Sequence, residues 1–164
     1  MNQAKLRDWL EIIGIFAVVA SLIFVGLEMR QAQEISMSQT YQSRTAAAAE
    51  WNTAFAANPA ALSAFRKASE GNEDEISTSE YDVLRRTLVG LHYLYDNAHY
   101  QFQSGFVSRD FWEMTRESLR NMMEIPVVND ILVGISERAG RPEFRDLVQE
   151  IGADLEAKVD ERSM

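Results

Sequence analysis

The chain has 164 residues, with 25 Asp and Glu against 16 Lys and Arg, two His and no Cys. This length predicts about one domain with a buried core, even when one segment lies in a membrane. The formal net charge of −9 repels phosphate backbones, which argues against nucleic acid as a partner. The lack of cysteine excludes disulfides, thiol nucleophiles and cysteine-ligated metals.

The first predicted element is an apolar helix from Ile12 to Leu27, in which Ser21 has the only strong hydrogen-bonding side chain. A helix of this length rises about 24 Å, less than the roughly 30 Å hydrocarbon core of a bilayer. Flanking residues must therefore complete a membrane span, and Trp9 stands where an interfacial aromatic side chain is expected. We predict that residues 1–30 form a single-pass membrane anchor.

Two other interpretations of the segment stay open: a helix buried in a hairpin or between copies of the chain, and a cleaved signal peptide. After Leu27 the chain continues as Glu-Met-Arg-Gln-Ala-Gln-Glu, a helix-forming stretch without the small residues of a cleavage site, which favours an uncleaved anchor. Basic residues are nearly balanced, with Lys5 and Arg7 before the segment and Arg30 and Arg44 after it. The positive-inside rule therefore assigns no side to the C-terminal domain.

A helical extension is predicted for residues 31–58, because no Gly or Pro occurs between Gly26 and Pro59 and helix-forming residues are abundant. One line of residues recurs at alternating spacings of three and four, which predicts a modest seam that packs on the domain or on a neighbouring copy. The seam consists of Ile35, Ser38, Tyr41, Thr45, Ala48, Asn52 and Phe55.

Residues 59–164 predict an acidic bundle of about five further helices. Asn58 and Pro59 form a start signal for the first of them, and Ser77 with Glu80 forms a capping box for the second, which is expected to end before Gly105. This second helix has an apolar stripe that predicts the centre of the domain. The stripe consists of Tyr81, Leu84, Leu88, Leu91, Tyr95, Ala98 and Phe102.

Three shorter helices are predicted after the central one. Ser108 caps the first, Pro126 breaks it and precedes the next, and Pro142 begins the last. No segment alternates like a strand over a useful length. The predicted fold is all-α: an N-terminal transmembrane helix extended into a compact multi-helix bundle.

A polar line beside the central stripe contains both histidines of the chain. His92, Asp96 and His99 at positions i, i+4 and i+7 can present two imidazoles and a carboxylate to one divalent metal. A di-metal carboxylate site needs a second carboxylate-x-x-His motif, and the sequence has no third histidine. The simpler interpretation is a hydrogen-bonded polar stripe at a helix contact, and we expect no cofactor.

Aromatic side chains near the histidines predict a second candidate site. Tyr95 and Tyr100, with Trp112 on the next helix, can line a small-ligand pocket with apolar walls and polar groups. A core of aromatic rings with hydroxyl groups at its rim explains them equally well. There is no nucleophile-elbow motif and no glycine-rich phosphate loop, so we assign no catalytic residue.

Three short features resemble those of an uncharacterised bacterial family with one N-terminal membrane helix and a helical domain of unknown function. They are the apolar segment leading into Leu27-Glu-Met-Arg-Gln, the stretch Tyr100-Gln-Phe-Gln-Ser-Gly105 followed by Trp112, and Pro142-Glu-Phe-Arg145. The resemblance implies membrane attachment and no particular chemistry.

The expected function is that of a membrane-anchored noncatalytic interaction or accessory subunit, which binds a protein partner or associates with itself. The alternative is a sensor or enzyme that binds a small ligand or a metal through the stripe of His92, Asp96 and His99. The expected surroundings are a lipid bilayer and a partner protein, without nucleic acid.

Overall fold

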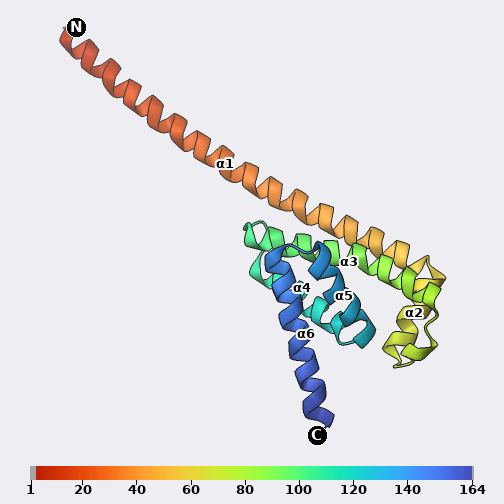
Figure 1. Ribbon diagram of the computed structural model, residues 1–164. Helices are drawn as coiled ribbons and strands as arrows, with labels where there is room; N and C mark the ends of the chain where they lie inside the picture. The colour runs from red at the N-terminus through yellow and green to blue at the C-terminus, as the bar shows by residue number, and fades with distance from the viewer. Residues whose placement is uncertain (1–2, 164) are drawn as a thin grey trace. The chain divides into compact units, whose positions relative to one another are not determined.

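A computed structural model describes residues 3–163 of the chain, with side chains described for residues 9–158. The described residues form six α-helices and one short 3-10 helix, and none of them lies in a strand (Figure 1), which confirms the predicted all-α fold. The elements are α1 (Gln3–Ala56), α2 (Pro59–Ser69), η1 (Glu73–Glu75), α3 (Thr78–Gln103), α4 (Arg109–Met123), α5 (Pro126–Ala139) and α6 (Pro142–Ser163).

The chain divides into two compact units, residues 1–41 and residues 42–164. The sequence predicted divisions after residues 30 and 58 instead. The difference arises because the last part of α1 carries Trp51 and Phe55, whose rings pack against residues of the bundle. That part of α1 therefore belongs to the second unit.

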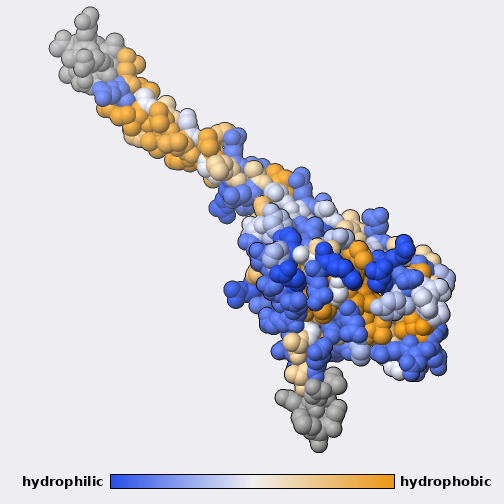
Figure 2. Space-filling model, viewed as in Figure 1, coloured by the Kyte–Doolittle hydropathy of each residue, from blue (hydrophilic) through white to orange (hydrophobic). Residues whose placement is uncertain are grey.

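In the first unit, α1 is one helix that is long and apolar enough to cross a membrane. Its most apolar window has a mean hydropathy of 2.6, and none of that window is buried. Large side chains stand exposed all around the segment, among them Phe16 at 70% and Leu22 at 67%. Figure 2 shows the segment as a hydrophobic stretch of α1.

The core of the second unit forms around α3, as predicted. Leu84, Leu88, Leu91, Tyr95 and Ala98 are buried, which confirms the middle of the predicted stripe. Its two ends differ, because Tyr81 is 39% exposed and Phe102 is half-buried. Buried residues from the other helices complete the core, among them Ala64, Leu119, Met123, Val128, Ile131, Leu132, Ile135, Phe144, Val148 and Ile151.

Local capping signals set the helix boundaries of the bundle. The Asn58 side chain accepts hydrogen bonds at the start of α2, and Ser108 caps α4. The predicted capping box of Ser77 and Glu80 is present at the start of α3. Gly105 follows α3 with a φ of +77°, a backbone conformation that glycine adopts without strain. These predictions are confirmed.

The Glu80 carboxylate also joins α2 to α3. It accepts hydrogen bonds from Ser63 Oγ at 2.7 Å and from Lys67 Nζ at 2.9 Å, besides those from Ser77. The hydrogen bonds from Ser63 and Lys67, followed by those from Ser77, hold the pKa of Glu80 well below its usual range. These contacts hold the two helices together across the loop that contains η1.

An aromatic contact attaches the end of α1 to the bundle. The indole of Trp51 donates a hydrogen bond from Nε1 to the carbonyl of Thr87 at 3.0 Å. A Cβ atom placed on Gly90 would lie 3.2 Å from Trp51 Cδ1, so the lack of a side chain at position 90 makes room for the indole. Phe55 stacks on Trp51 at 5.2 Å and meets Phe65 edge to face at 5.6 Å.

The packed face of α1 in the second unit lies about one residue away from the predicted seam. Its partly buried positions are Arg44, Ala47, Trp51 and Phe55, which also follow the spacing of three and four. Of the predicted seam residues in this unit, Thr45, Ala48 and Asn52 are exposed and Phe55 is partly buried. The seam left out Trp51, the largest side chain of the contact.

We predict that Trp51→Ala lowers the free energy of unfolding of the bundle by about 2 kcal/mol, because a half-buried ring, its stacking and one hydrogen bond are lost. Urea unfolding of the detergent-solubilised chain, followed by far-UV circular dichroism, measures this change. Asn52→Ala is the matched control, since Asn52 is exposed and its side-chain amide donates to the Ala48 carbonyl of its own helix. Equal stability of the two variants would contradict the contact.

Candidate functional site

The polar line predicted on α3 lies at the contact of this helix with α5 and α6. His92, Asp96 and His99 are 1%, 8% and 8% exposed. Each of them contacts residues that follow α3 in the chain. The arrangement agrees with the simpler interpretation, a buried polar stripe between helices.

His92 contacts one residue from α5 and one from α6. Its Nε2 lies 2.9 Å from Ser136 Oγ, and its ring centroid lies 5.3 Å from that of Phe144. The Nδ1 atom is buried without a hydrogen-bond partner among the described residues. Burial lowers the pKa of His92, and the nearby charge of Asp96 opposes this shift only in part. The imidazole therefore stays neutral at neutral pH.

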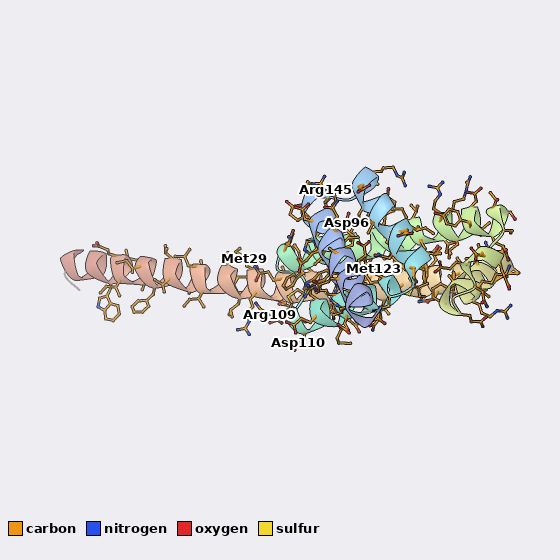
Figure 3. The ribbon with its side chains drawn as sticks, turned by 60° about the horizontal axis from the view of Figure 1, so that its bottom comes forward. Met29, Asp96, Arg109, Asp110, Met123 and Arg145 are labelled. Carbon is orange, nitrogen blue, oxygen red and sulfur yellow. The ribbon has the colours of Figure 1, made fainter. Side chains whose placement is uncertain are left out.

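Asp96 is the carboxylate partner of Arg141. The Asp96 Oδ1 atom accepts hydrogen bonds from Arg141 Nε at 3.0 Å and from Nη2 at 2.8 Å, and Nη2 also donates to the Asp96 carbonyl. The Arg141 guanidinium also lies 4.6 Å from the ring centroid of Tyr100. This pair joins the end of α3 to the residue that precedes α6. Asp96 is labelled within the bundle in Figure 3, as is Met123 of the core.

His99 lies among aromatic rings. Its centroid is 4.9 Å from that of Trp112 and 5.8 Å from that of Phe144, and its Nδ1 atom has no hydrogen-bond partner among the described residues. Burial lowers the pKa of His99, and the positive charge of Arg141 lowers it further. His99 is thus a second neutral imidazole in the interior.

The structure gives two of the three predicted metal ligands other partners. The Asp96 carboxylate is bound by Arg141, and the His92 Nε2 atom is paired with Ser136. Among the residues that the structure describes, no group of three His, Cys, Asp or Glu side chains is placed to hold a metal ion. Metal binding by the stripe stays a prediction that the observed contacts do not support.

The predicted aromatic site is divided among different surroundings. Tyr95 is buried and its hydroxyl lies 3.0 Å from Ser118 Oγ. Tyr100 is 55% exposed and lies against Arg141. Trp112 is buried and stacks on Phe102 at 5.7 Å. Of the three, Tyr95 lines the groove described next, whereas Tyr100 and Trp112 lie outside that groove.

The second unit instead has an apolar groove between α1, α3 and α4, with a cavity volume of about 480 Å³. This volume lies within the usual range of small-ligand sites. Much of its wall comes from residues that the sequence did not assign to a ligand site, among them Arg44, Trp51 and Phe111 together with Met114. The spacing of three and four on each helix could be read from the sequence. The sequence did not indicate that α1 and α4 would both line one groove.

We predict that the two buried histidines make the bundle less stable in mild acid. In the unfolded chain an imidazole titrates near pH 6.5, and burial lowers the pKa of both side chains in the folded chain. Above pH 6.5 both states are neutral. As pH falls below 6.5, the unfolded chain binds protons that the folded chain does not, so the free energy of unfolding decreases.

Urea midpoints measured between pH 7.5 and 5.5 test this expectation. The double variant His92→Gln/His99→Gln removes both imidazoles and is expected to flatten the pH dependence over this range. If the double variant keeps the slope of the natural chain, then other groups cause it and the histidines do not.

Comparison of the chain with protein-family models, with curated proteins and with solved structures gave no match.

Proposed function

We propose that the protein is a membrane-anchored interaction or accessory subunit without catalytic activity of its own. In this proposal the apolar part of α1 spans a bilayer, and the helical bundle on one side binds a protein partner or another copy of the chain. The observation that carries the proposal is the continuous apolar surface of α1 between Ile12 and Leu27, whose large side chains are exposed all around the helix.

Contact of this apolar surface with water is unfavourable. Burial of one large apolar side chain contributes about 1.5 to 3 kcal/mol. The segment exposes many of them, including Ile13, Phe16 and Phe24 at 56%, 70% and 60%. Monomeric soluble proteins rarely expose a patch of this size. A bilayer buries every side of the helix at once, whereas a single partner helix would leave one side in water.

Two features support the interaction role: the net charge of the chain and the contacts of the polar side chains inside the bundle. The chain has a formal net charge of −9, which favours a partner with a basic surface. The groups best suited to acid-base chemistry are engaged inside the bundle, since His92 is paired with Ser136 and Asp96 with Arg141. These side chains stabilise the contact of α3 with its neighbours.

We predict that the full chain stays with membranes through a carbonate wash and that Val19→Arg/Ile23→Arg releases it. Two arginines at the middle of a span cost about 6 kcal/mol of insertion free energy. Ile35→Arg/Met37→Arg is the matched control, because it adds the same charge outside the apolar segment. Immunoblots of pellet and supernatant give the fractions. Release of the unaltered chain by carbonate would contradict the anchor and favour a helix buried between copies.

The accessory role predicts a defined complex. We expect the chain, extracted in native lipid nanodiscs, to have a discrete mass above that of one chain, by native mass spectrometry. Ile35→Glu places a charge on an exposed apolar position of the predicted seam and is expected to reduce the complex. Gln33→Glu is the control, since its side chain points away from Ile35 on the helix. A mass of one chain alone would contradict the accessory role and leave the anchor intact.

A further inference from the structure

The groove between α1, α3 and α4 lies entirely within the second unit, since all of its lining residues fall in residues 42–164. Its lining residues recur every three or four positions on α3, from Leu91 to Gln101, and on α4, from Phe111 to Met122. Between residues 91 and 101 an α-helix rises about 15 Å. The groove is therefore elongated along α3.

The middle of the groove offers a ligand mainly apolar contact. The Tyr95 hydroxyl is paired with Ser118, and Thr115 Oγ1 donates to the carbonyl of Phe111 at 2.8 Å. Methionine side chains adapt their shape to flexible apolar ligands. The groove therefore suits an extended apolar chain. Its apolar wall includes Leu91, Leu94, Ala98, Met114 and Met122.

The end of the groove at Gln101 has a buried hydrogen-bond acceptor. Gln101 Nε2 donates to Asn97 Oδ1 at 2.6 Å, while Gln101 Oε1 is buried without a hydrogen-bond partner among the described residues. A buried carbonyl oxygen without a donor loses the hydrogen bond that water would give it. A ligand whose head carries an O–H or N–H group can restore this bond.

The charges of the wall favour a neutral head. Among the described residues that line the groove there is no Asp or Glu, so an ammonium head would have no counter-ion. A carboxylate has no proton to donate to Gln101 Oε1, and its lone pairs would face those of the amide oxygen. Burial of an unpaired charge is far more costly than burial of a neutral group. A hydroxyl group donates one proton and carries no charge.

The groove continues along α4 into a second, more open hollow. Met114, Ser118 and Met122 line both hollows, and Phe65 lines the second. The second hollow also includes Glu117, which is exposed. This carboxylate would repel an anionic ligand, whereas it leaves a neutral chain unaffected. A long apolar chain can therefore extend past Met122 toward Phe65.

We propose that the groove binds a neutral single-chain amphiphile with a hydroxyl head, of the long-chain alcohol class. The hydroxyl donates to Gln101 Oε1, and the chain lies along α3 toward Leu91 and Met122. The site goes beyond the accessory role. It does not depend on the membrane anchor, because the groove belongs to the second unit alone.

The test uses the full chain in nanodiscs and two photoactivatable primary alcohols of equal length. One probe carries a diazirine at the far end of its chain, and the other carries it beside the hydroxyl. Crosslinked peptides are identified by mass spectrometry. We expect saturable labelling near Leu91 and Met122 with the first probe and near Gln101 with the second. The opposite pattern would contradict the position of the head.

The source of the ligand is compared in the same experiment. Each probe is either mixed into the nanodisc lipids or added from water, and the labelling rates of the two samples compare the bilayer with water. Saturable labelling of the groove from either source supports the site.

The methyl ether of the first probe tests the head, because it has the same chain and no proton to donate. We expect about tenfold weaker half-saturation for the ether, expressed as the mole fraction of probe in the lipid. Gln101→Leu is expected to bring the alcohol and the ether to the same half-saturation. Gln103→Leu is the matched control, since Gln103 is an exposed residue of the same helix outside the groove.

A second pair of variants locates the chain. Ala48→Trp fills the groove from an exposed position and is expected to reduce labelling about tenfold. Ala49→Trp changes an exposed residue outside the groove and is expected to have no effect. If Ala48→Trp lowers the helix content, Met114→Glu takes its place, since it adds a charge to the wall from a position that is 73% exposed.

Three results would overturn the proposal. Equal half-saturation for the alcohol and the ether in the unaltered chain would remove the hydroxyl head. Labelling confined to residues 12–27 would indicate a lipid-like probe around the apolar helix. Unchanged labelling in folded Ala48→Trp and Met114→Glu variants would remove the groove as the site.

Discussion

The contact of Trp51 with Gly90 is the constraint that attaches the end of α1 to the helical bundle. A Cβ atom at position 90 would lie 3.2 Å from the indole, which would have to shift to make room. Without the indole, the end of α1 would lose its hydrogen bond to Thr87. Phe55, which stacks on Trp51 and meets Phe65 edge to face, continues the same contact toward α2. The lack of a side chain at position 90 thus lets α1 lie close to α3, and α1 gives the groove its third wall.

The other side of α3 has a different character. Its polar stripe contains two neutral imidazoles and an ion pair in contact with α5 and α6. Such a stripe contributes less stability than an apolar contact of the same area, because polar groups lose water on burial. It restricts the helices to one register, since the Asp96 and Arg141 atoms meet only in that register. The central helix therefore has an adaptable apolar side and a specific polar side.

The sequence predicted most of the fold because its signals are local. The capping box at Ser77, the cap at Ser108 and the stripe from Leu84 to Ala98 each depend on residues a few positions apart. The site was predicted less well because it depends on distant residues. Nothing near Trp51 in the sequence indicates that Gly90 will receive it, and nothing near Asp96 indicates Arg141.

The hydrogen bonds of Glu80 have a practical consequence for the loop between Glu70 and Ile76. Ser63 and Lys67 already hold α2 against α3, so the connection between the helices does not rely on a short loop. Lengthening a loop adds little closure entropy, and most residues of this one are exposed. The loop is therefore a suitable place to insert an epitope or a fluorophore that reports on the bundle without loosening it.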